Sequence, residues 1–186
     1  MRAATFVEPY LVEVVDRPDP VIEAPSDALV RVKLAAICGS DLHPYRGNEV
    51  GLDSGTVLGH EFIGEVVAVG AAVSQIALGD RVVSPFSTSC GVCFYCAASL
   101  TARCERGELF GWIEGGRGLH GGQAELVRVP LADNTLLVVP KGIAAVPALF
   151  AGDILSTGLF AASSGGVGPG DVVVVIGSGP VGLMCV

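Results

Sequence analysis

Residues 28–37, "ALVRVKLAAI", alternate apolar and polar side chains along most of their length. Arg31 and Lys33 fall on one face of an extended chain. The opposite face carries Val30, Val32, Leu34 and Ala36. A period of two residues is typical of a strand with one buried face. We therefore expect a half-buried strand here.

Similar short runs follow further along the chain, at residues 61–70 ("EFIGEVVAVG"), 79–85 ("GDRVVSP") and 123–130 ("QAELVRVP"). Glycine, proline, aspartate and asparagine separate them, which favours turns between strands. From residue 1 to about residue 140 the chain thus predicts an irregular antiparallel barrel or sandwich, so that the loops must carry its chemistry.

The character of the chain changes after Pro140. Residues 143–165 are rich in alanine and leucine, with few β-branched side chains, and predict one or two helical segments that end at Gly165 and Gly166. Residues 172–176, "VVVVI", then predict a buried strand that runs into a glycine-rich turn.

That turn, "GSGPVG", is a G-x-G-x-x-G element between a predicted strand and a predicted helix. In this context backbone N–H groups and the helix dipole can hold a pyrophosphate. The candidate cofactor-binding residues are Gly177, Gly179, Pro180, Val181 and Gly182. The residue that distinguishes NAD from NADP would lie about 20 positions further on. We expect the lone strand and the start of the helix to lie exposed, disordered or packed against another copy, and this chain alone to bind zinc but to turn over substrate poorly or not at all.

Composition narrows the possible partners. The 186 residues carry a formal net charge of -8 and no basic run, which argues against nucleic acid or an anionic membrane surface. The N-terminus lacks the apolar core of a signal peptide, and no apolar run approaches the roughly 20 residues of a membrane span. We expect a cytoplasmic protein with a small-molecule substrate, in which crowded cysteines hold metal rather than form disulfides.

Four cysteines lie within residues 90–104 and are spaced C-x2-C-x2-C-x7-C. They are Cys90, Cys93, Cys96 and Cys104, with Gly91 available for a tight turn. Four thiolates at about 2.3 Å from one ion form a closed tetrahedral zinc site without room for substrate. This zinc should be structural; free thiols, a disulfide or a redox pair fit the spacing less well.

A second set of metal ligands is scattered along the chain. Cys38 lies in "ICGSDLH", His60 in "GHE" and Asp153 in "AGDILSTG". One cysteine, one histidine and one carboxylate would form a zinc site with an open fourth position, which catalysis needs. Taken singly, Cys38 could be a core residue and Asp153 a capping or solvated side chain.

Together these patterns resemble the zinc-dependent medium-chain alcohol dehydrogenase family. The stretch from Gly59, written Gly-His-Glu-x2-Gly-x5-Gly-x2-Val, fits the zinc signature of that family at each specified position. The resemblance implies a mainly β chain with some α: a GroES-like, partly open β-barrel catalytic domain at residues 1–145, with the structural zinc lobe at about 87–110. A connecting helical segment at 146–170 and the first strand and helix start of a Rossmann domain at 171–186 would follow.

By this resemblance Cys38, His60 and Asp153 look like the catalytic zinc ligands, and Glu61 like an occasional one. An aspartate at position 153 is similar to the bacterial secondary-alcohol and formaldehyde dehydrogenase branches. Many members of the family have cysteine or glutamate at this ligand position, so Asp153 departs from their pattern.

The resemblance also implies roles around the zinc. Ser40 looks like the hydroxyl that contacts the substrate oxygen, and His43 like the end of a proton relay to solvent. Asp41 looks like the group that orients His60, and Thr157 like the residue that packs against the nicotinamide.

Four further residues attract attention. Trp112 resembles a pocket-lining aromatic of the secondary-alcohol branch, although a position on the barrel rim is equally compatible with the sequence. We expect His120 to be a loop residue and Cys185 a small core residue. Ser99 stands where many members have glycine, so an ordinary residue must make that turn.

The function implied is an NAD(P)-dependent zinc alcohol dehydrogenase with two zinc ions per chain, which transfers hydride between an alcohol and an aldehyde or ketone. A polyol or amino-alcohol dehydrogenase of the same family is an alternative, as is a non-catalytic, zinc-stabilised binding module. The cysteines make a zinc-free quinone reductase relative improbable. The family resemblance implies homodimers or homotetramers.

Overall fold

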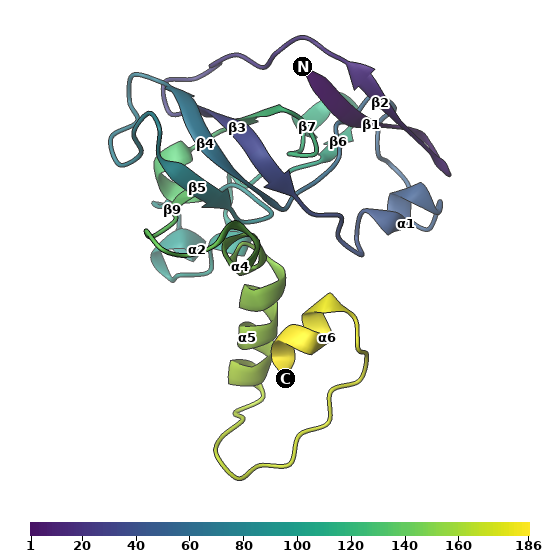
Figure 1. The fold of residues 1–186 in the computed structure, drawn as a ribbon, viewed down its shortest axis with the longest axis vertical. Coiled ribbons are helices and arrows are strands. Elements are labelled where there is room, and N and C mark those ends of the chain that lie inside the picture. Colours follow the sequence, from purple (N-terminus) through teal and green to yellow (C-terminus); the bar gives the residue numbers. More distant parts are fainter.

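A computed structural model describes residues 1–186. Its central element is a five-stranded antiparallel sheet with the strand order β8-β3-β4-β5-β9. The strands are β3 (Ala28–Ala35), β4 (Phe62–Val69), β5 (Arg81–Ser84), β8 (Leu126–Val129) and β9 (Leu137–Val138). The predicted strands over residues 28–37, 61–70, 79–85 and 123–130 are thereby confirmed (Figure 1).

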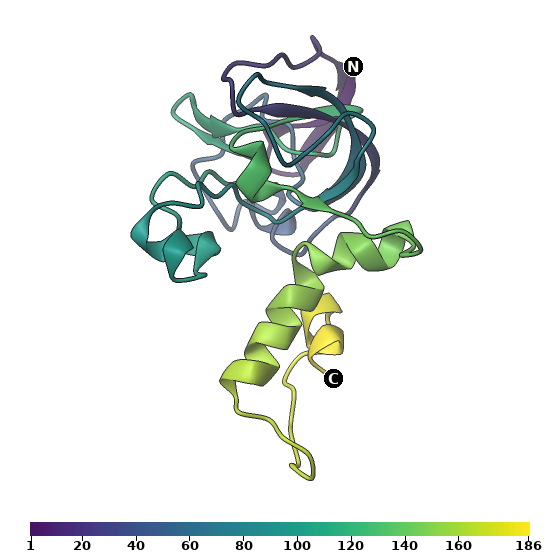
Figure 2. The same ribbon diagram turned by 90° about the vertical axis from the view of Figure 1, so that its left-hand side faces the viewer.

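Two small antiparallel sheets complete the barrel. One pairs β1 (Arg2–Glu8) with β2 (Leu11–Asp16), and the other pairs β6 (Trp112–Glu114) with β7 (Arg117–Leu119). Isolated bridges join Ala3 to Ala124 and Thr5 to Val57, so that β1 closes against the loops that flank the main sheet. The strands curve around one interior when the molecule is seen from the side (Figure 2).

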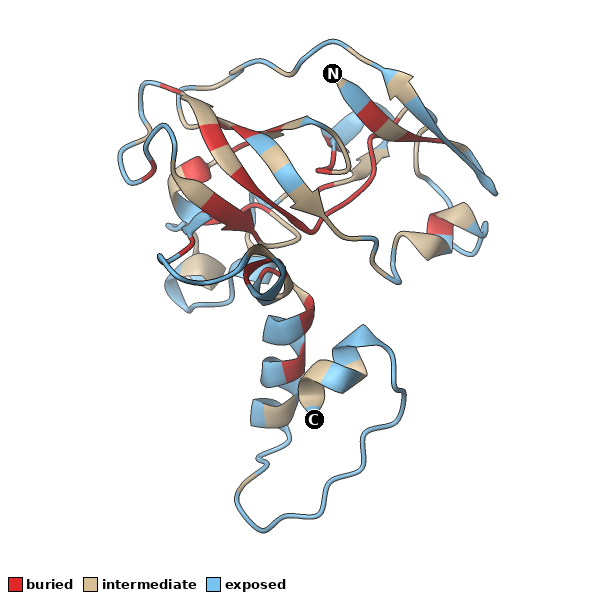
Figure 3. Cartoon of the chain, viewed as in Figure 1, coloured by how far each residue is buried: buried red, intermediate tan, exposed pale blue.

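The interior of the barrel holds the largest apolar cluster of the chain. Phe62 of β4 and Phe110 pack edge to face, with ring centroids 5.2 Å apart, and Val30 and Val127 are buried beside them. Along β3 the burial follows the predicted alternation, since Val30 is buried while Arg31 and Lys33 are exposed. Buried residues concentrate in this part of the molecule (Figure 3).

Short helices interrupt the loops of the barrel. They are α1 (Leu42–Tyr45), α2 (Phe94–Ala97), the 3-10 helix η1 (Thr101–Arg103) and α3 (Ala132–Thr135). Helix α2 and η1 belong to the four-cysteine lobe, which projects from one side of the barrel in Figure 2.

The C-terminal part is helical and extends away from the barrel (Figure 1). Helices α4 (Ala145–Ala151) and α5 (Ile154–Ser164) confirm the prediction of one or two helical segments, and α6 (Pro180–Cys185) is the predicted helix after the glycine-rich turn. No single helix is long and apolar enough to cross a membrane, although α4 and α5, joined at a 50° bend, would pass such a test together on length and composition.

The prediction of a strand over Val172–Ile176 was wrong, because no strand forms there. Val172 and Ile176 are each 97% exposed. A parallel strand needs hydrogen-bonding neighbours on its edges, and none is present beside this segment. The exposure of this run agrees with the expectation that a lone strand would not be covered.

Candidate metal centres and active site

The four cysteines of the projecting lobe converge on one point. Their sulfur atoms all lie within 4.8 Å of one another. Gly91 adopts φ +73°, which places the first turn of the lobe in the left-handed region as the sequence indicated. The structure therefore brings together Cys90, Cys93, Cys96 and Cys104, and six free cysteines leave no disulfide in the chain.

The lobe already provides donors for negative sulfur atoms. The backbone N–H groups of Cys90 and Arg106 donate to Cys104 Sγ at 3.2 and 3.4 Å. Backbone N–H groups of Cys96 and Glu105 lower the pKa of Cys93 to about 6, whereas desolvation raises the pKa of Cys96 to about 11. Thiolates are the form that binds zinc, so the lowered pKa of Cys93 and the N–H donors to Cys104 fit a metal site, whereas Cys96 would have to lose its proton as the metal binds.

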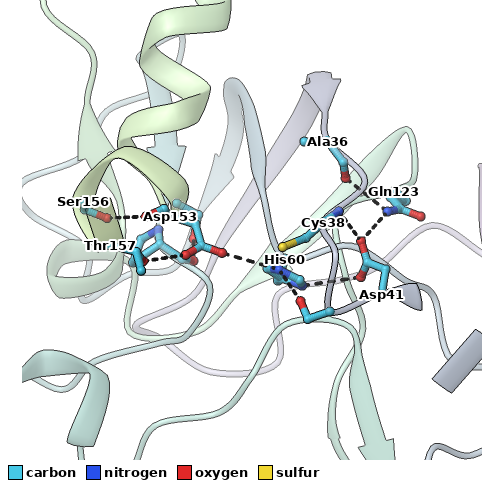
Figure 4. Close-up of polar contacts among 11 residues, drawn as sticks. Ala36, Cys38, Asp41, His60, Gln123, Asp153, Ser156 and Thr157 are labelled. Atoms are coloured by element: carbon cyan, nitrogen blue, oxygen red, sulfur yellow. Dashed lines mark hydrogen bonds and ion pairs between the residues drawn. The ribbon is translucent and has the colours of Figure 1, made fainter. Parts of the chain in front are cut away.

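The second cluster gathers residues from three separate segments. Cys38 lies in the loop after β3, His60 and Glu61 directly precede β4, and Asp153 lies between α4 and α5. One donor atom of each of these side chains lies within 4.8 Å of the others. Figure 4 shows the Cys38 sulfur and the Asp153 carboxylate both pointing toward the His60 ring.

Two carboxylates face opposite ring nitrogens of His60. Asp41 Oδ1 lies 3.5 Å from Nδ1, and Asp153 Oδ2 lies 3.5 Å from Nε2. Burial by itself lowers the pKa of His60, but hydrogen bonds with Asp153, Asp41 and Cys38 outweigh it and raise the pKa to about 12. A metal binds the neutral imidazole, so a cation at Nε2 would take the place of a proton among these acidic groups.

Glu61 supplies a direct test of whether this cluster fits a metal. Its side chain is 2% exposed, and its Oε2 atom is buried without a hydrogen-bond partner. Burial raises the pKa of this carboxyl group. A buried oxygen without a donor is costly, and a cation beside it would remove that cost. Sulfur, imidazole and carboxylate donors together are the ligand types that zinc prefers.

Asp153 combines a helix start with a ligand position. It is the N-cap residue of α5, but its side chain makes no capping hydrogen bond to that helix. Instead Thr157 Oγ1 donates to Asp153 Oδ1 at 3.1 Å, which leaves Oδ2 directed at His60. Thr157 thus holds the carboxylate in this structure, a contact that the sequence did not indicate.

Ser40 and His43 lie near the cluster, but their side chains are not hydrogen-bonded to each other. Ser40 Oγ is 3.3 Å from His60 Nε2. Only a backbone hydrogen bond, from the His43 N–H to the Ser40 carbonyl at 3.1 Å, links the two residues. A proton would need an intervening water or ligand hydroxyl to pass from one side chain to the other.

Two cavities meet at the cluster, and Ser40 lines both. The first, of about 570 Å³, is bounded by His60 and Asp153 and by apolar side chains. These are Leu58, Phe86, Leu109, Phe110 and Trp112. Trp112 therefore lies on a cavity wall rather than only on the barrel rim.

The second cavity, of about 860 Å³, reaches the other side of the cluster. Cys38, His43 and Glu61 line it together with the glycine-rich turn. The turn residues are Gly177, Gly179, Pro180, Val181 and Gly182. The fold thus brings the predicted cofactor-binding residues next to the predicted metal ligands, although Thr157 lines neither cavity.

Gln123 is a site residue that the sequence analysis missed. Its side-chain amide donates to Asp41 Oδ2 at 3.2 Å and to the Ala36 carbonyl at 3.1 Å (Figure 4). The sequence shows only a glutamine after two glycines, and no spacing rule connects it to Asp41. Of the other residues noted, His120 accepts a hydrogen bond from the Val57 N–H at 3.1 Å in a loop, as expected, and Cys185 Sγ contacts the Gly158 carbonyl.

Comparison with known families gives a match over most of the barrel. The family described as alcohol dehydrogenase GroES-like domain matches residues 24–141.

Two curated relatives cover nearly all of this chain. A medium chain reductase/dehydrogenase of Acremonium sp is 45% identical over 100% of this chain and 64% of its own length. Zinc-type alcohol dehydrogenase B of Aspergillus flavus is 48% identical over 98% of this chain and 43% of its own length. The chain spans about half the length of the curated relatives that it matches.

Solved structures agree with this fold. An alcohol dehydrogenase from Thermus sp. ATN1 superposes with a TM-score of 0.93 at 47% identity, covering 99% of this chain and 53% of that protein. A zinc-binding dehydrogenase of Sinorhizobium meliloti 1021, solved with NADP, superposes with a TM-score of 0.82 at 31% identity, covering 98% of this chain and 51% of that protein.

Proposed function

The chain belongs to the zinc-type medium-chain alcohol dehydrogenase family, and from this premise we propose that it forms the catalytic part of an enzyme that transfers hydride between an alcohol and a nicotinamide. The observation that carries the proposal is the place of the Cys38, His60, Glu61 and Asp153 cluster between two cavities. One cavity can hold a substrate and the other the cofactor, with the reacting atoms meeting at the metal ligands.

We propose that Cys38, His60 and Asp153 hold a catalytic zinc, with Glu61 as an occasional ligand. When bound, zinc supplies a Lewis acid that polarises a carbonyl and lowers the pKa of an alcohol. The chain's own contribution is to orient the ligands. Asp41 faces His60 Nδ1 and so leaves Nε2 for the metal.

Ser40 is proposed to contact the substrate hydroxyl, since it lies at the junction of the two cavities. His43 lines the cofactor cavity and would pass the proton on to solvent through an intervening hydroxyl or water. The apolar wall that includes Trp112 favours an alcohol with an apolar body beside its hydroxyl group.

The cofactor is proposed to be NAD or NADP. The glycine-rich turn at residues 177–182 precedes helix α6 and lines the larger cavity, which supports pyrophosphate binding there by the complete protein. The NADP in the Sinorhizobium structure supports the same class of cofactor. Residues 1–145 would form the catalytic domain, 146–170 the connection and 171–186 the start of the nucleotide-binding domain.

The four-cysteine lobe is proposed to hold a second, structural zinc, so that each chain binds two. Six free cysteines fit a reducing compartment such as the cytoplasm. By analogy with its family, the complete protein would assemble as a dimer or tetramer.

Metal analysis tests this proposal against a simple zinc-stabilised module. The unaltered chain should bind two zinc ions. The His60→Ala variant should lose one and keep the other, and the Cys90→Ser variant should do the reverse. A single zinc that His60→Ala leaves in place would overturn the catalytic site and support the module.

Activity is the second test and requires the complete protein. Primary, secondary and polyhydric alcohols with NAD and with NADP should show zinc-dependent oxidation, whereas the 186-residue chain alone should show little or none. Because the alcohol-dependent rate must vanish in His60→Ala, oxidation that persists in that variant would contradict the assignment.

A further inference from the structure

We propose that Gln123 is a positioning residue for the catalytic metal site, acting through Asp41. This inference rests on the metal site proposed above. It adds a layer behind the ligands, because Gln123 contacts neither the metal ligands' donor atoms nor the cavity that would hold substrate.

The Asp41 carboxylate is held from two directions. The Cys38 backbone N–H donates to its Oδ2 atom at 2.8 Å, and the Gln123 amide donates to the same atom at 3.2 Å. With Oδ2 occupied, Oδ1 is left to face His60 Nδ1 at 3.5 Å. The side chains of Asp41 and His60 are only 9% and 11% exposed, so water cannot readily replace these partners.

The orientation of the Gln123 amide has only one chemically consistent solution. Its NH₂ group faces two acceptors, the Asp41 carboxylate and the Ala36 carbonyl. The reverse orientation would place an oxygen against both of these oxygens. Each of the two amide hydrogens therefore has a partner, and Gln123 links Asp41 to the end of β3, from which the loop with Cys38 departs.

The backbone of Gln123 is fixed as firmly as its side chain. Its N–H donates to the Leu58 carbonyl, and its carbonyl accepts from the Ala4 N–H, both at 2.8 Å. A side chain at Gly59 would place its Cβ 2.4 Å from Gln123 Cγ, and Gly59 adopts φ +94°. Gly59, next to the proposed ligand His60, thus leaves room for the Gln123 side chain, which in turn holds Asp41 against His60.

Groups behind a ligand fix its orientation and basicity, and their loss typically lowers metal affinity about 10- to 100-fold. Replacing Gln123 by leucine would remove both donors while keeping a similar volume. Replacing it by glutamate would keep the shape but set a second negative charge against Asp41. Both changes should loosen the Asp41–His60 contact.

The test is a zinc titration of the 186-residue chain against a competing chromogenic chelator. Gln123→Leu and Gln123→Glu should weaken zinc binding at the Cys38 cluster about 10- to 100-fold, while the four-cysteine lobe keeps its affinity as an internal control. The matched control is Gln75→Leu, because Gln75 is exposed and only its backbone N–H is engaged, with Asp133. In an Asp41→Ala background, Gln123→Leu should cost little more.

The outcomes separate this inference from the proposed function. If the unaltered chain binds no zinc at the Cys38 cluster, the proposed function fails first. If it binds zinc there and both Gln123 variants bind equally well, the inference alone is overturned. Loss of both zinc ions in both variants, or full additivity with Asp41→Ala, would show a general folding role and overturn it as well.

Discussion

The histidines of this chain show how neighbours decide what one residue type does. His60 lies between two carboxylates and a thiol, and its pKa is raised to about 12. His120 instead has Arg17 Nη2 at 3.4 Å from its Nε2, while its Nδ1 accepts from the Val57 N–H. Desolvation, followed by the charges of Arg17 and Arg128, lowers the pKa of His120.

This difference predicts an acid-sensitive contribution to stability from His120. Because its pKa is lower in the folded chain than in the unfolded one, the unfolded state binds more protons as the pH falls. Its contribution is therefore present above about pH 6.5 and is lost as the pH falls through the folded pKa. His120→Gln keeps an acceptor for Val57 but cannot titrate, so the unaltered chain should lose stability relative to this variant on acidification.

Urea unfolding of both proteins between about pH 7 and pH 5 measures this relative loss of stability, which should be modest because His120 is exposed and solvent screens the charges of Arg17 and Arg128. Arg17→Gln should reduce the effect, because it removes the nearest positive charge. Parallel pH profiles of the unaltered chain and His120→Gln would contradict the prediction.

At the scale of elements, the four-cysteine lobe contains two left-handed turn positions, one occupied by glycine and the other by serine. Gly91 occupies the left-handed region at φ +73°, where a side chain would place Cβ 2.1 Å from Asn134 Oδ1. Ser99 also lies in that region, at φ +61°, although it carries a side chain. The loop conformation that glycine would favour is kept here by a serine, so the turn holds backbone strain.

Ser99→Gly should therefore stabilise the zinc-loaded chain, by about 1 kcal/mol. Gly91→Ala should destabilise it by at least about 1 kcal/mol, since it adds the same strain together with a close contact. Thermal unfolding with saturating zinc measures both effects. A lower melting temperature for Ser99→Gly would mean that the serine side chain, rather than the backbone, holds the turn.

The elements also show where local pattern is sufficient. Alternation in residues 28–37 predicted β3, and the alanine-rich composition of residues 143–165 predicted α4 and α5. β3 and α4 bury a face against the chain's own core, whereas α5 buries only Ile154 and Gly158. The run at residues 172–176 has an equally clear β pattern and forms no strand. Hydrogen-bonding neighbours decide that case, and they are not a property of the run itself.

At the scale of the whole molecule, the exposed run beyond α5 is the least protected surface. Val172 and Ile176 are 97% exposed and Val174 is 81% exposed, and the run carries no charge. Such β-branched segments favour association between chains. Val174→Asp should therefore lower the concentration-dependent light scattering of this chain severalfold without changing its zinc content.

Val50→Asp is the matched control, since Val50 is an isolated exposed valine and the substitution adds the same charge. If both variants reduced the scattering equally, net charge rather than the apolar run would explain the association.

Features that depend on neighbours along the chain could be predicted from the residues alone. Cys90, Cys93, Cys96 and Cys104 lie so close in sequence that a single short loop brings their thiols together. The clustering of these cysteines is therefore a local property of the chain. The strands that cover the core could also be predicted from the alternation of apolar and polar residues along them.

The surroundings of the second cluster depend on contacts between distant parts of the chain. The family resemblance implied that Cys38, His60 and Asp153 are zinc ligands. Their distances, the unpartnered oxygen of Glu61 and the hydrogen bond from Thr157 to Asp153 required coordinates. Gln123 had no sequence signal at all, because its partner Asp41 lies 82 residues away. Contacts across such separations arise from how the barrel closes, and no local period records them.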